Sequence, residues 1–243
     1  KTGAASNILD ANASNLNPSK VDRIFDVQGS TTLTLENLTL KNGKKEGALG
    51  GCIFVPSGKV ELTDCIIENC TAGGGGAIGV KGEAKLTNTV IKKCEATSTT
   101  LGGGAIYTKG GKVTMTNCTL TGNTAKNGGA VYAIKHSSGS TVTISGGTIG
   151  GTNPGEANEA TGTNGSGGGI YINDGCTLTL DLDTYNNTGT EISGNKAGHG
   201  GGVQAINSTV TMTGCIVSGN TATDSSNLGG GGGVYTHGGT LSM

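Results

Sequence analysis

Seven copies of a short glycine-rich motif recur along this chain, and they constrain its fold more than any other feature. Each copy has two glycines, a small residue and then Ile or Val, often followed by an aromatic residue. Successive copies begin between 25 residues (50 to 75) and 39 residues (128 to 167) apart. They read GGCIF at 50–54, GGAIG at 75–79, GGAIY at 103–107, GGAVY at 128–132, GGGIY at 167–171, GGGVQ at 200–204 and GGGVY at 231–235. Self-similarity at such spacings is the signature of a repeat architecture.

A second motif accompanies the glycine pairs and alternates apolar with polar residues. In VTMTNCTLTGN, Val113 and Met115 are followed by Cys118 and Leu120, so the alternation changes phase near Asn117. Other copies are LTLENLTLKNG at 33–43, VELTDCIIENC at 60–70, AKLTNTVIKKC at 84–94, VTISGGTIGGT at 142–152, LTLDLDTYNNTGTEISGN at 178–195 and VTMTGCIVSGN at 210–220. A period of two predicts β-strands, and the change of phase predicts a corner between two of them.

These repeats predict an all-β fold, a right-handed parallel β-helix (a pectin-lyase-like solenoid) of about eight coils. Each strand would pair with its equivalent in the next coil, about 4.8 Å away along the axis. The helical pattern of apolar residues is missing. A β-sandwich or a β-propeller is the structural alternative, but the four antiparallel strands and the aromatic signatures that each propeller blade requires are missing from the sequence. We expect one domain over 1–243, with 1–32 as the first coil and N-terminal end, 33–243 as repeats, and a longer parent chain.

The composition agrees with a thin core and excludes several kinds of partner. The chain has 48 glycines and 3% aromatic residues, which leaves few large side chains for a thick globular core. Its 16 basic and 17 acidic residues give a net charge of −1, with no basic patch for nucleic acid. No apolar run approaches the roughly 20 residues that span a bilayer. We expect no nucleic-acid partner and no membrane span in this segment.

Stacking of equivalent residues explains the positions of the asparagines and of the seven cysteines. Asn side chains stacked on consecutive coils can bond along the axis. Alignment of the repeats places Asn123, Asn195 and Asn220 in one column, Cys70 and Cys94 on neighbouring coils of that column, and Cys65, Cys118 and Cys215 in another. A small-residue column comprises Cys52, Ala77, Ala105, Ala130, Gly169, Gly202 and Gly233. Parallel Cβ vectors disfavour a Cys70–Cys94 disulfide, so we expect buried free thiols and no zinc site.

The repeats resemble a family of bacterial surface proteins. The motif GGA[ILV] is intact at 75–78, 103–106 and 128–131, and it alternates with a motif ending in Asn, such as LTGN at 120–123. This pattern resembles the repeats of chlamydia-type polymorphic outer-membrane proteins, and more broadly those of right-handed β-helix surface proteins. The segment RIFDVQGSTTLTLENLTLKNG at 23–43 is similar to the first coil of many such proteins. The chain differs from the family's FxxN motif, because the position of its Phe is occupied by Ile67, Ile91, Leu120, Ile192 and Val217.

The resemblance implies a non-catalytic adhesin that is secreted or lies on the bacterial cell surface. It would be the passenger of an outer-membrane autotransporter and would act as a virulence factor. Its partner would be a host cell-surface protein, a matrix protein or a glycan. Right-handed β-helices also include polysaccharide lyases and glycoside hydrolases, so a carbohydrate-active enzyme is the alternative. Open strand edges at the two ends of the solenoid can also associate end to end.

The sequence offers no complete catalytic set, so we expect no enzyme activity. Arg23, which is the single Arg, lies between Asp22 and Asp26 and is interpreted as part of a surface pair or of an end-coil contact. Asp181 and Asp183 alternate with leucines, so both are predicted to point outward about 7 Å apart. With Asp174 they are the weak candidates for a calcium site or a carboxylate pair, against the alternative of a solvated face.

The histidines and the glycine clusters add no catalytic or cofactor site to these candidates. His136, His199 and His237 occupy different repeat positions and are interpreted as surface residues. Glycine clusters lack the Lys-Ser/Thr of a phosphate loop, so no cofactor is expected.

Two insertions, Asn153–Ser166 and Asp183–Thr190, are the candidate binding loops. Long loops on a rigid scaffold often carry binding, although insertions without a ligand are equally compatible with the sequence. The candidate residues are Asn153, Glu156, Asn158, Glu159, Asn164, Tyr185, Asn186 and Asn187.

A less favoured alternative is ice binding by outward threonines. It would use Thr114 with Thr116, Thr141 with Thr143, and Thr209 with Thr211 and Thr213. Charged residues interrupt these rows on other coils.

Overall fold

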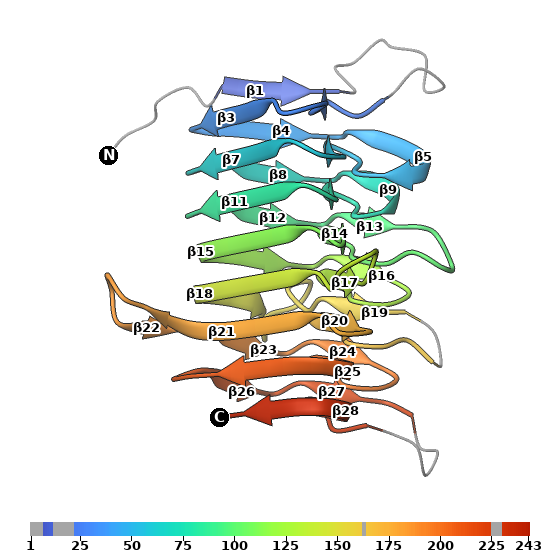
Figure 1. Cartoon of the computed structure of the whole chain (residues 1–243), viewed down its shortest axis with the longest axis vertical. Coiled ribbons are helices and arrows are strands. Elements are labelled where there is room, and N and C mark those ends of the chain that lie inside the picture. The colour runs from blue at the N-terminus through green and yellow to red at the C-terminus, as the bar shows by residue number, and fades with distance from the viewer. Residues whose placement is uncertain (1–6, 12–21, 162–163, 225–229) are drawn as a thin grey trace.

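The structure, a computed structural model, describes residues 7–11, 22–161, 164–224 and 230–243 (Figure 1). It confirms the predicted all-β, right-handed parallel β-helix of about eight turns. Strands follow one another around the axis and stack along it, so each coil contacts only its neighbours. Apart from one hairpin, every pairing between the described strands is parallel, and Figure 1 shows the coils stacked as successive layers from β1 at the top to β28 at the bottom.

A full coil contains four strand positions, called here the first to fourth series. The first series is β2 (Phe25–Asp26), β6 (Ile53–Val55), β10 (Ile78–Val80), β14 (Ile106–Lys109), β17 (Val131–Ile134) and β20 (Ile170–Asn173). The second is β3 (Thr32–Glu36), β7 (Lys59–Thr63), β11 (Glu83–Thr87) and β21 (Thr177–Asp183). The third is β1 (Asn7–Asp10), β4 (Leu38–Lys41), β8 (Ile66–Glu68), β12 (Val90–Lys92), β23 (Glu191–Ser193) and β26 (Ile216–Ser218).

Four longer strands run through two positions each. β25 (Val203–Met212) and β28 (Val234–Ser242) cover the first and second series, while β15 (Lys112–Thr121) and β18 (Thr141–Gly150) cover the second and third. The fourth series forms a separate seven-stranded sheet. Its members are β5 (Lys44–Leu49), β9 (Thr71–Gly74), β13 (Glu95–Ala96), β16 (Thr124–Ala125), β19 (Glu159–Ala160), β24 (Lys196–Ala197) and β27 (Thr221–Ala222).

Equivalent apolar side chains stack into columns that fill the tube. Ile78 pairs in register with Ile106, and Ile106 with Val131, so the glycine-rich motif supplies one column as predicted. All three side chains are fully buried. The strands of one coil enclose a narrow interior. Small and β-branched side chains are therefore large enough to fill it, whereas a thicker globular core would need larger side chains.

The corner predicted at Asn117 is confirmed, and the backbone shows why Asn occurs there. Asn37, Asp64, Asn88 and Asn117 have φ between 48° and 52°, in the left-handed region that Asn and Asp tolerate better than other non-glycine residues. Asn117 Nδ2 also donates to Asn88 Oδ1 at 3.0 Å, which links corners on successive coils. The left-handed residue turns the chain and changes the phase of alternation.

Candidate functional site

Four asparagines on consecutive coils form a hydrogen-bonded ladder inside the tube. The Nδ2 atom of Asn123 donates to Oδ1 of Asn158 at 2.9 Å, and Asn158 donates likewise to Asn195 at 3.0 Å. Asn195 Nδ2 donates to Asn220 Oδ1 at 2.9 Å. The column predicted from Asn123, Asn195 and Asn220 is therefore confirmed, with one additional member.

That additional member, Asn158, was predicted to be a binding-loop residue, and this prediction is wrong. Its side chain is fully buried, and its amide bonds the coils on either side. A signal for this role was present in the sequence, because Asn158 lies two residues before Ala160, just as Asn123 lies two residues before Ala125. The long insertion hid that match when whole repeats were aligned.

The small-residue column faces this ladder across the interior. A Cβ atom added to Gly169 would lie 3.2 Å from Asn195 Nδ2, and one added to Gly202 would lie 3.0 Å from Asn220 Nδ2. Residues at these positions stay small because the asparagine amides occupy the space beside them. The asparagine column therefore supplies hydrogen bonds along the axis, and the small residues that face it leave space for its amides.

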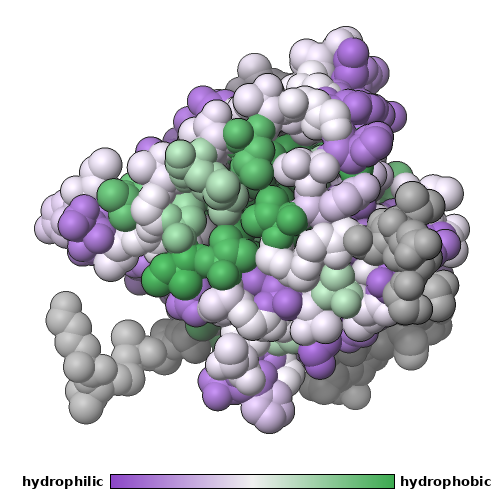
Figure 2. Space-filling model, turned by 90° about the horizontal axis from the view of Figure 1, so that it is seen from below, coloured by the Kyte–Doolittle hydropathy of each residue, from purple (hydrophilic) through white to green (hydrophobic). Residues whose placement is uncertain are grey.

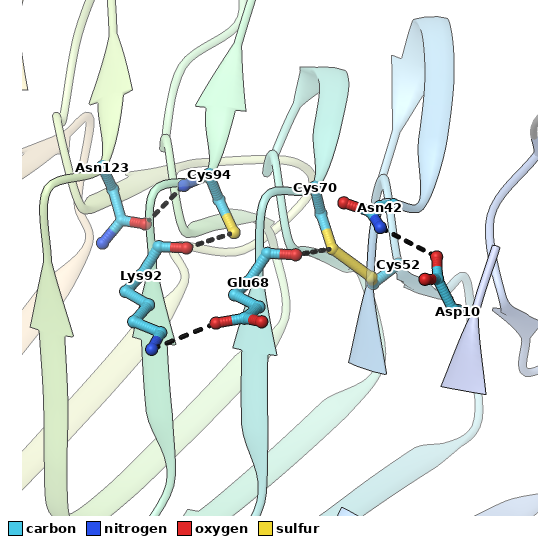
Figure 3. Close-up of a disulfide and its surroundings, with 8 residues drawn as sticks. All are labelled: Asp10, Asn42, Cys52, Glu68, Cys70, Lys92, Cys94 and Asn123. Carbon is cyan, nitrogen blue, oxygen red and sulfur yellow. Dashed lines mark hydrogen bonds and ion pairs between the residues drawn. A yellow bond between two sulfur atoms is a disulfide. The ribbon is translucent and has the colours of Figure 1, made fainter. Parts of the chain in front are cut away.

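In the coil that begins with β6, the two facing columns are joined by a disulfide between Cys52 and Cys70 (Figure 3). Their Cα atoms are 5.9 Å apart. The expectation that these two cysteines are free is wrong, and so is the alternative Cys70–Cys94 bridge. Cys70 and Cys94 are neighbours along one column, whereas Cys52 and Cys70 lie in two facing columns of the same coil. Repetition in the sequence indicates neighbours along a column but not across the tube. Cys94 instead donates its thiol to Lys92 O at 3.3 Å.

The five remaining cysteines are free, and four of them are buried as expected. Burial raises the pKa of Cys94 to about 12 and that of Cys118 to about 11, because the thiolate loses its hydration. Reactive cysteines have lowered pKa values and solvent access. These two thiols therefore behave as small apolar residues of the core.

A hairpin leaves the solenoid after Asp181 and is the most prominent projecting feature of the described residues (Figure 1). β21 pairs with the antiparallel strand β22 (Thr188–Gly189). Asp183 closes its turn by accepting hydrogen bonds from Tyr185 N at 3.0 Å and Asn186 Nδ2 at 2.8 Å. The backbone N–H of Asn187 donates to Asp183 O at 2.6 Å. These three bonds define the turn, and Tyr185 at its tip is 93% exposed.

The carboxylates of this region do not lie as predicted. Asp183 is only 5% exposed, so the expectation that Asp181 and Asp183 both point outward is wrong. The regular alternation ends because the chain turns into the hairpin, and Leu182 covers Gly214 of the next coil. Asp174 is exposed in the turn before β21, and the length of that strand, about 20 Å, separates it from Asp183.

Metal-ligating residues do not gather elsewhere in the part of the chain that the structure describes. Within these ranges, no group of three or more His, Cys, Asp or Glu side chains is placed to hold a metal ion.

Glu156, which belongs to the insertion that begins at Asn153, lines a polar groove of about 240 Å³ over the third-series strands. Glu156 and Glu191 both line it, and Glu156 Oε2 accepts hydrogen bonds from Asn153 N at 3.2 Å and Asn153 Nδ2 at 2.9 Å. The floor is made of small hydroxyl side chains and glycines. The remaining lining residues are Thr119, Thr121, Thr148, Gly150, Gly151, Thr152 and Ser193.

The other candidates in this insertion lie apart from the groove. Glu159 is exposed on β19 and pairs in register with Thr124 and Lys196. Asn164 is exposed beside two residues outside the described ranges. The insertion therefore contributes Asn153 and Glu156 to one surface, Glu159 to another, and Asn158 to the interior.

His199 differs from the other two histidines. Its Nε2 atom lies 3.1 Å from Asp224 Oδ2, and the two side chains are 17% and 18% exposed. The interpretation of His199 as a simple surface residue is wrong, because the fold brings two distant loops together here. His136 and His237 are exposed as expected.

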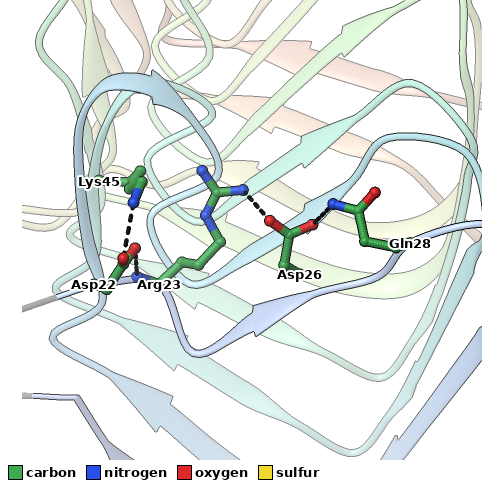
Figure 4. Close-up of polar contacts among 5 residues, drawn as sticks. All are labelled: Asp22, Arg23, Asp26, Gln28 and Lys45. Atoms are coloured by element: carbon green, nitrogen blue, oxygen red, sulfur yellow. Dashed lines mark hydrogen bonds and ion pairs between the residues drawn. The ribbon is translucent and has the colours of Figure 1, made fainter.

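Arg23 makes the end-coil contacts expected for it (Figure 4). Its guanidinium lies 3.0 Å from the Asp26 carboxylate and 4.8 Å from the centre of the Phe54 ring. Asp26 also accepts from Gln28, and Asp22 accepts from Lys45 at 2.8 Å. The bond from Lys45 and that from the Arg23 N–H lower the pKa of Asp22. This network ties the first coil to the strands beside it.

Threonines align in outward columns on the second-series strands. Thr141, Thr177, Thr209 and Thr240 pair in register, as do Thr114, Thr143, Thr179 and Thr211. Lys112 and Lys85 precede them in the two columns. A third column, Thr63, Thr87 and Thr116, lies nearer the N-terminal end and continues into Ser145 and Asp181. Each threonine row is therefore interrupted at one end, and ice binding stays a prediction.

Comparison with known proteins gives one result. The model of the right-handed β-helix region matches residues 25–242, which is most of the chain. No curated protein and no solved structure matches. A search of the described residues for a helix long and apolar enough to cross a membrane finds none.

Proposed function

The chain belongs to the right-handed β-helix family, and from this premise we propose that it is a non-catalytic, adhesin-like solenoid, secreted or on the cell surface. Its coils would serve as a stiff scaffold that holds binding loops away from the axis. The partner would be a host cell-surface protein, a matrix protein or a glycan. The observation that carries this proposal is the hairpin tip with Tyr185 fully presented to solvent.

The structure of the tip supports binding. An exposed large aromatic residue loses apolar hydration when a partner covers it, and Tyr has few side-chain torsions to immobilise. Asp183 already fixes the turn through its bonds to Tyr185 N and Asn186 Nδ2, so little backbone freedom remains to be lost on binding. Asn186 and Asn187 are exposed beside the ring and can supply directional hydrogen bonds.

The proposal is tested by measuring binding of the chain to a panel of glycans, matrix proteins and intact host cells. We expect saturable binding without turnover, weakened at least about tenfold by Tyr185→Ala, as for a residue that dominates an interface. Ser137→Ala is the control, since Ser137 is exposed in a turn that lies outside both candidate binding loops. Absence of saturable binding across the panel, or equal binding by Tyr185→Ala and the native chain, would overturn the proposal.

A carbohydrate-active enzyme is the second candidate, and one observation favours it. Glu156 and Glu191 line the same groove together with threonine hydroxyls, and glycoside hydrolysis uses two carboxylates that flank the scissile bond. Release of reducing sugar from a polysaccharide panel, abolished by Glu191→Gln, would favour this candidate over the adhesin. No sugar release, together with unchanged glycan binding by Glu191→Gln, would remove it.

A further inference from the structure

Positive charge is concentrated in the middle coils of the solenoid. Residues 96–155 contain four lysines and no acidic residue, whereas residues 156–243 contain seven acidic residues and one lysine. The net charge of the chain is only −1, so its composition does not reveal this separation of charge along the axis. A surface of one sign on a nearly neutral protein attracts ligands of the opposite sign.

The coiling aligns three exposed or half-buried lysines in one row. Lys81 and Lys109 are neighbours on consecutive coils, because the residues directly before them pair in register. Lys109 pairs in turn with Ile134, which Lys135 follows directly. Figure 1 labels β14 and β17, which end at Lys109 and just before Lys135 and lie one above the other in the stack. Lys81, Lys109 and Lys135, called here the lysine row, thus present three charges within about 10 Å along the axis.

The lysine row lacks the acidic partners that other lysines of this molecule have. Lys44 lies 2.6 Å from Glu46, and Lys92 lies 3.0 Å from Glu68. Within the described ranges, no carboxylate lies at ion-pair distance from a lysine of the row. Asp174 has the equivalent position on the following coil and marks the end of the row. Like charges held close together repel one another, so an anion that neutralises them is bound favourably.

The outward side of the second-series strands lies beside the row and supplies hydrogen-bonding groups. Lys112 begins β15 there, and its side chain is 60% exposed, with Glu83 3.9 Å away. The column that contains Lys112 continues on the next coils with Thr141, Thr177 and Thr209. Figure 2, which views the molecule along its axis, shows hydrophilic side chains around the rim and hydrophobic ones toward the middle. The wall of the solenoid therefore offers charges and hydroxyl groups rather than an apolar surface.

We propose that the lysine row, with the threonine column beside it, binds a linear anionic polysaccharide that lies along the solenoid axis. Sulfate or carboxylate groups of the polymer would pair with the three ammonium groups of the row. Its sugar hydroxyls would exchange hydrogen bonds with the threonine hydroxyls, which both donate and accept. Because the coils fix the spacing of the lysines, one extended chain can contact all of them at once.

A polysaccharide fits this surface better than a nucleic acid does. Proteins that bind single-stranded nucleic acids stack the bases on exposed aromatic rings. Tyr107 and Tyr132, on the same strands as the row, are 1% and 8% exposed and cannot serve in this way. The surface is also separate from the hairpin that carries Tyr185, so binding at the two places can be tested independently.

The test uses heparin, hyaluronan and neutral dextran as immobilised probes for the 243-residue chain, over a range of salt concentrations. Hyaluronan carries carboxylates alone and heparin carries sulfates as well, so the pair separates the two anionic groups. One variant combines Lys81→Gln, Lys109→Gln and Lys135→Gln. It should bind heparin at least about tenfold more weakly, and the slope of log affinity against log salt should be shallower by about three, one for each lysine removed.

The matched control combines Lys44→Gln, Lys45→Gln and Lys92→Gln. It removes the same total charge from lysines that are paired with carboxylates on other strands. At physiological salt it should keep the native affinity for heparin within about twofold, because distant surface charges are screened. Circular dichroism checks that both variants keep the native strand content. Should the lysine-row variant fail to fold, the exposed Lys135→Gln replaces it, with an expected change in slope of about one.

Four results would overturn the proposal. The first is the absence of salt-dependent binding to both heparin and hyaluronan. The second is a lysine-row variant that binds heparin as tightly as the native chain does, or no more weakly than the control variant. The third is dextran bound as tightly as heparin, since charge would then contribute nothing. The fourth is a single-stranded oligonucleotide bound more tightly than heparin, which would make the ligand a nucleic acid.

Discussion

The strongest quantitative prediction concerns Asn158, which sequence alignment placed in a loop and the structure places in the core. Substitution Asn158→Ala removes four side-chain hydrogen bonds. The Oδ1 atom accepts from Asn123 N at 3.0 Å and from Asn123 Nδ2 at 2.9 Å. The Nδ2 atom donates to Leu120 O at 2.8 Å and to Asn195 Oδ1 at 3.0 Å.

The expected cost follows from the net value of buried hydrogen bonds. At about 1 kcal/mol each, four bonds correspond to a loss of about 4 kcal/mol in the free energy of unfolding. For a chain of this size that loss lowers the melting temperature by about 10 °C. Because coils stabilise their neighbours, the loss should appear in the coils on both sides of Asn158.

Thermal and urea unfolding followed by circular dichroism measure the effect, with Asn164→Ala as the control in the same insertion. The control removes an exposed amide and should change the unfolding free energy by less than about 0.5 kcal/mol. A loss below about 1 kcal/mol in Asn158→Ala, or one equal to that of the control, would refute the ladder as a source of stability.

Three further outcomes are expected. Ile106→Asp buries a charge in a column flanked by Ile78 and Val131, so it should unfold several adjacent coils, and a melting temperature equal to the native one would contradict the placement of Ile106. Peptide mapping without reduction should find Cys52 linked to Cys70, and a Cys70–Cys94 peptide would contradict the structure. Reduction of the disulfide should lower the free energy of unfolding by about 3 kcal/mol for a loop of this length. Near neutral pH, alkylation should modify the partly exposed Cys215 first, because burial raises the pKa of Cys94 and Cys118; equal labelling of all free thiols would show that the core opens readily.

The candidate surfaces were less accessible to sequence reasoning than the fold. Tyr185 and Asn186 were identified from the insertion that contains them, and both lie on the projecting hairpin. Glu191 was missed because it is a strand residue whose groove is created by a loop from the preceding coil. The contact between His199 and Asp224 was missed because the two residues belong to no shared motif and meet only through the stacking of coils.

The sequence by itself determined the architecture, because the same order of glycine pair, alternating apolar residues and corner residue recurs along the chain and admits one way of stacking like upon like. It therefore specified the register of Ile78, Ile106 and Val131, and most of the asparagine column. Only the tertiary structure decided which columns face each other across the tube, and hence that Cys52 bonds to Cys70 and that Asn158 is buried. The physical reason is that repetition defines neighbours along the axis, whereas contacts across the interior and over the insertions depend on where each corner turns the chain.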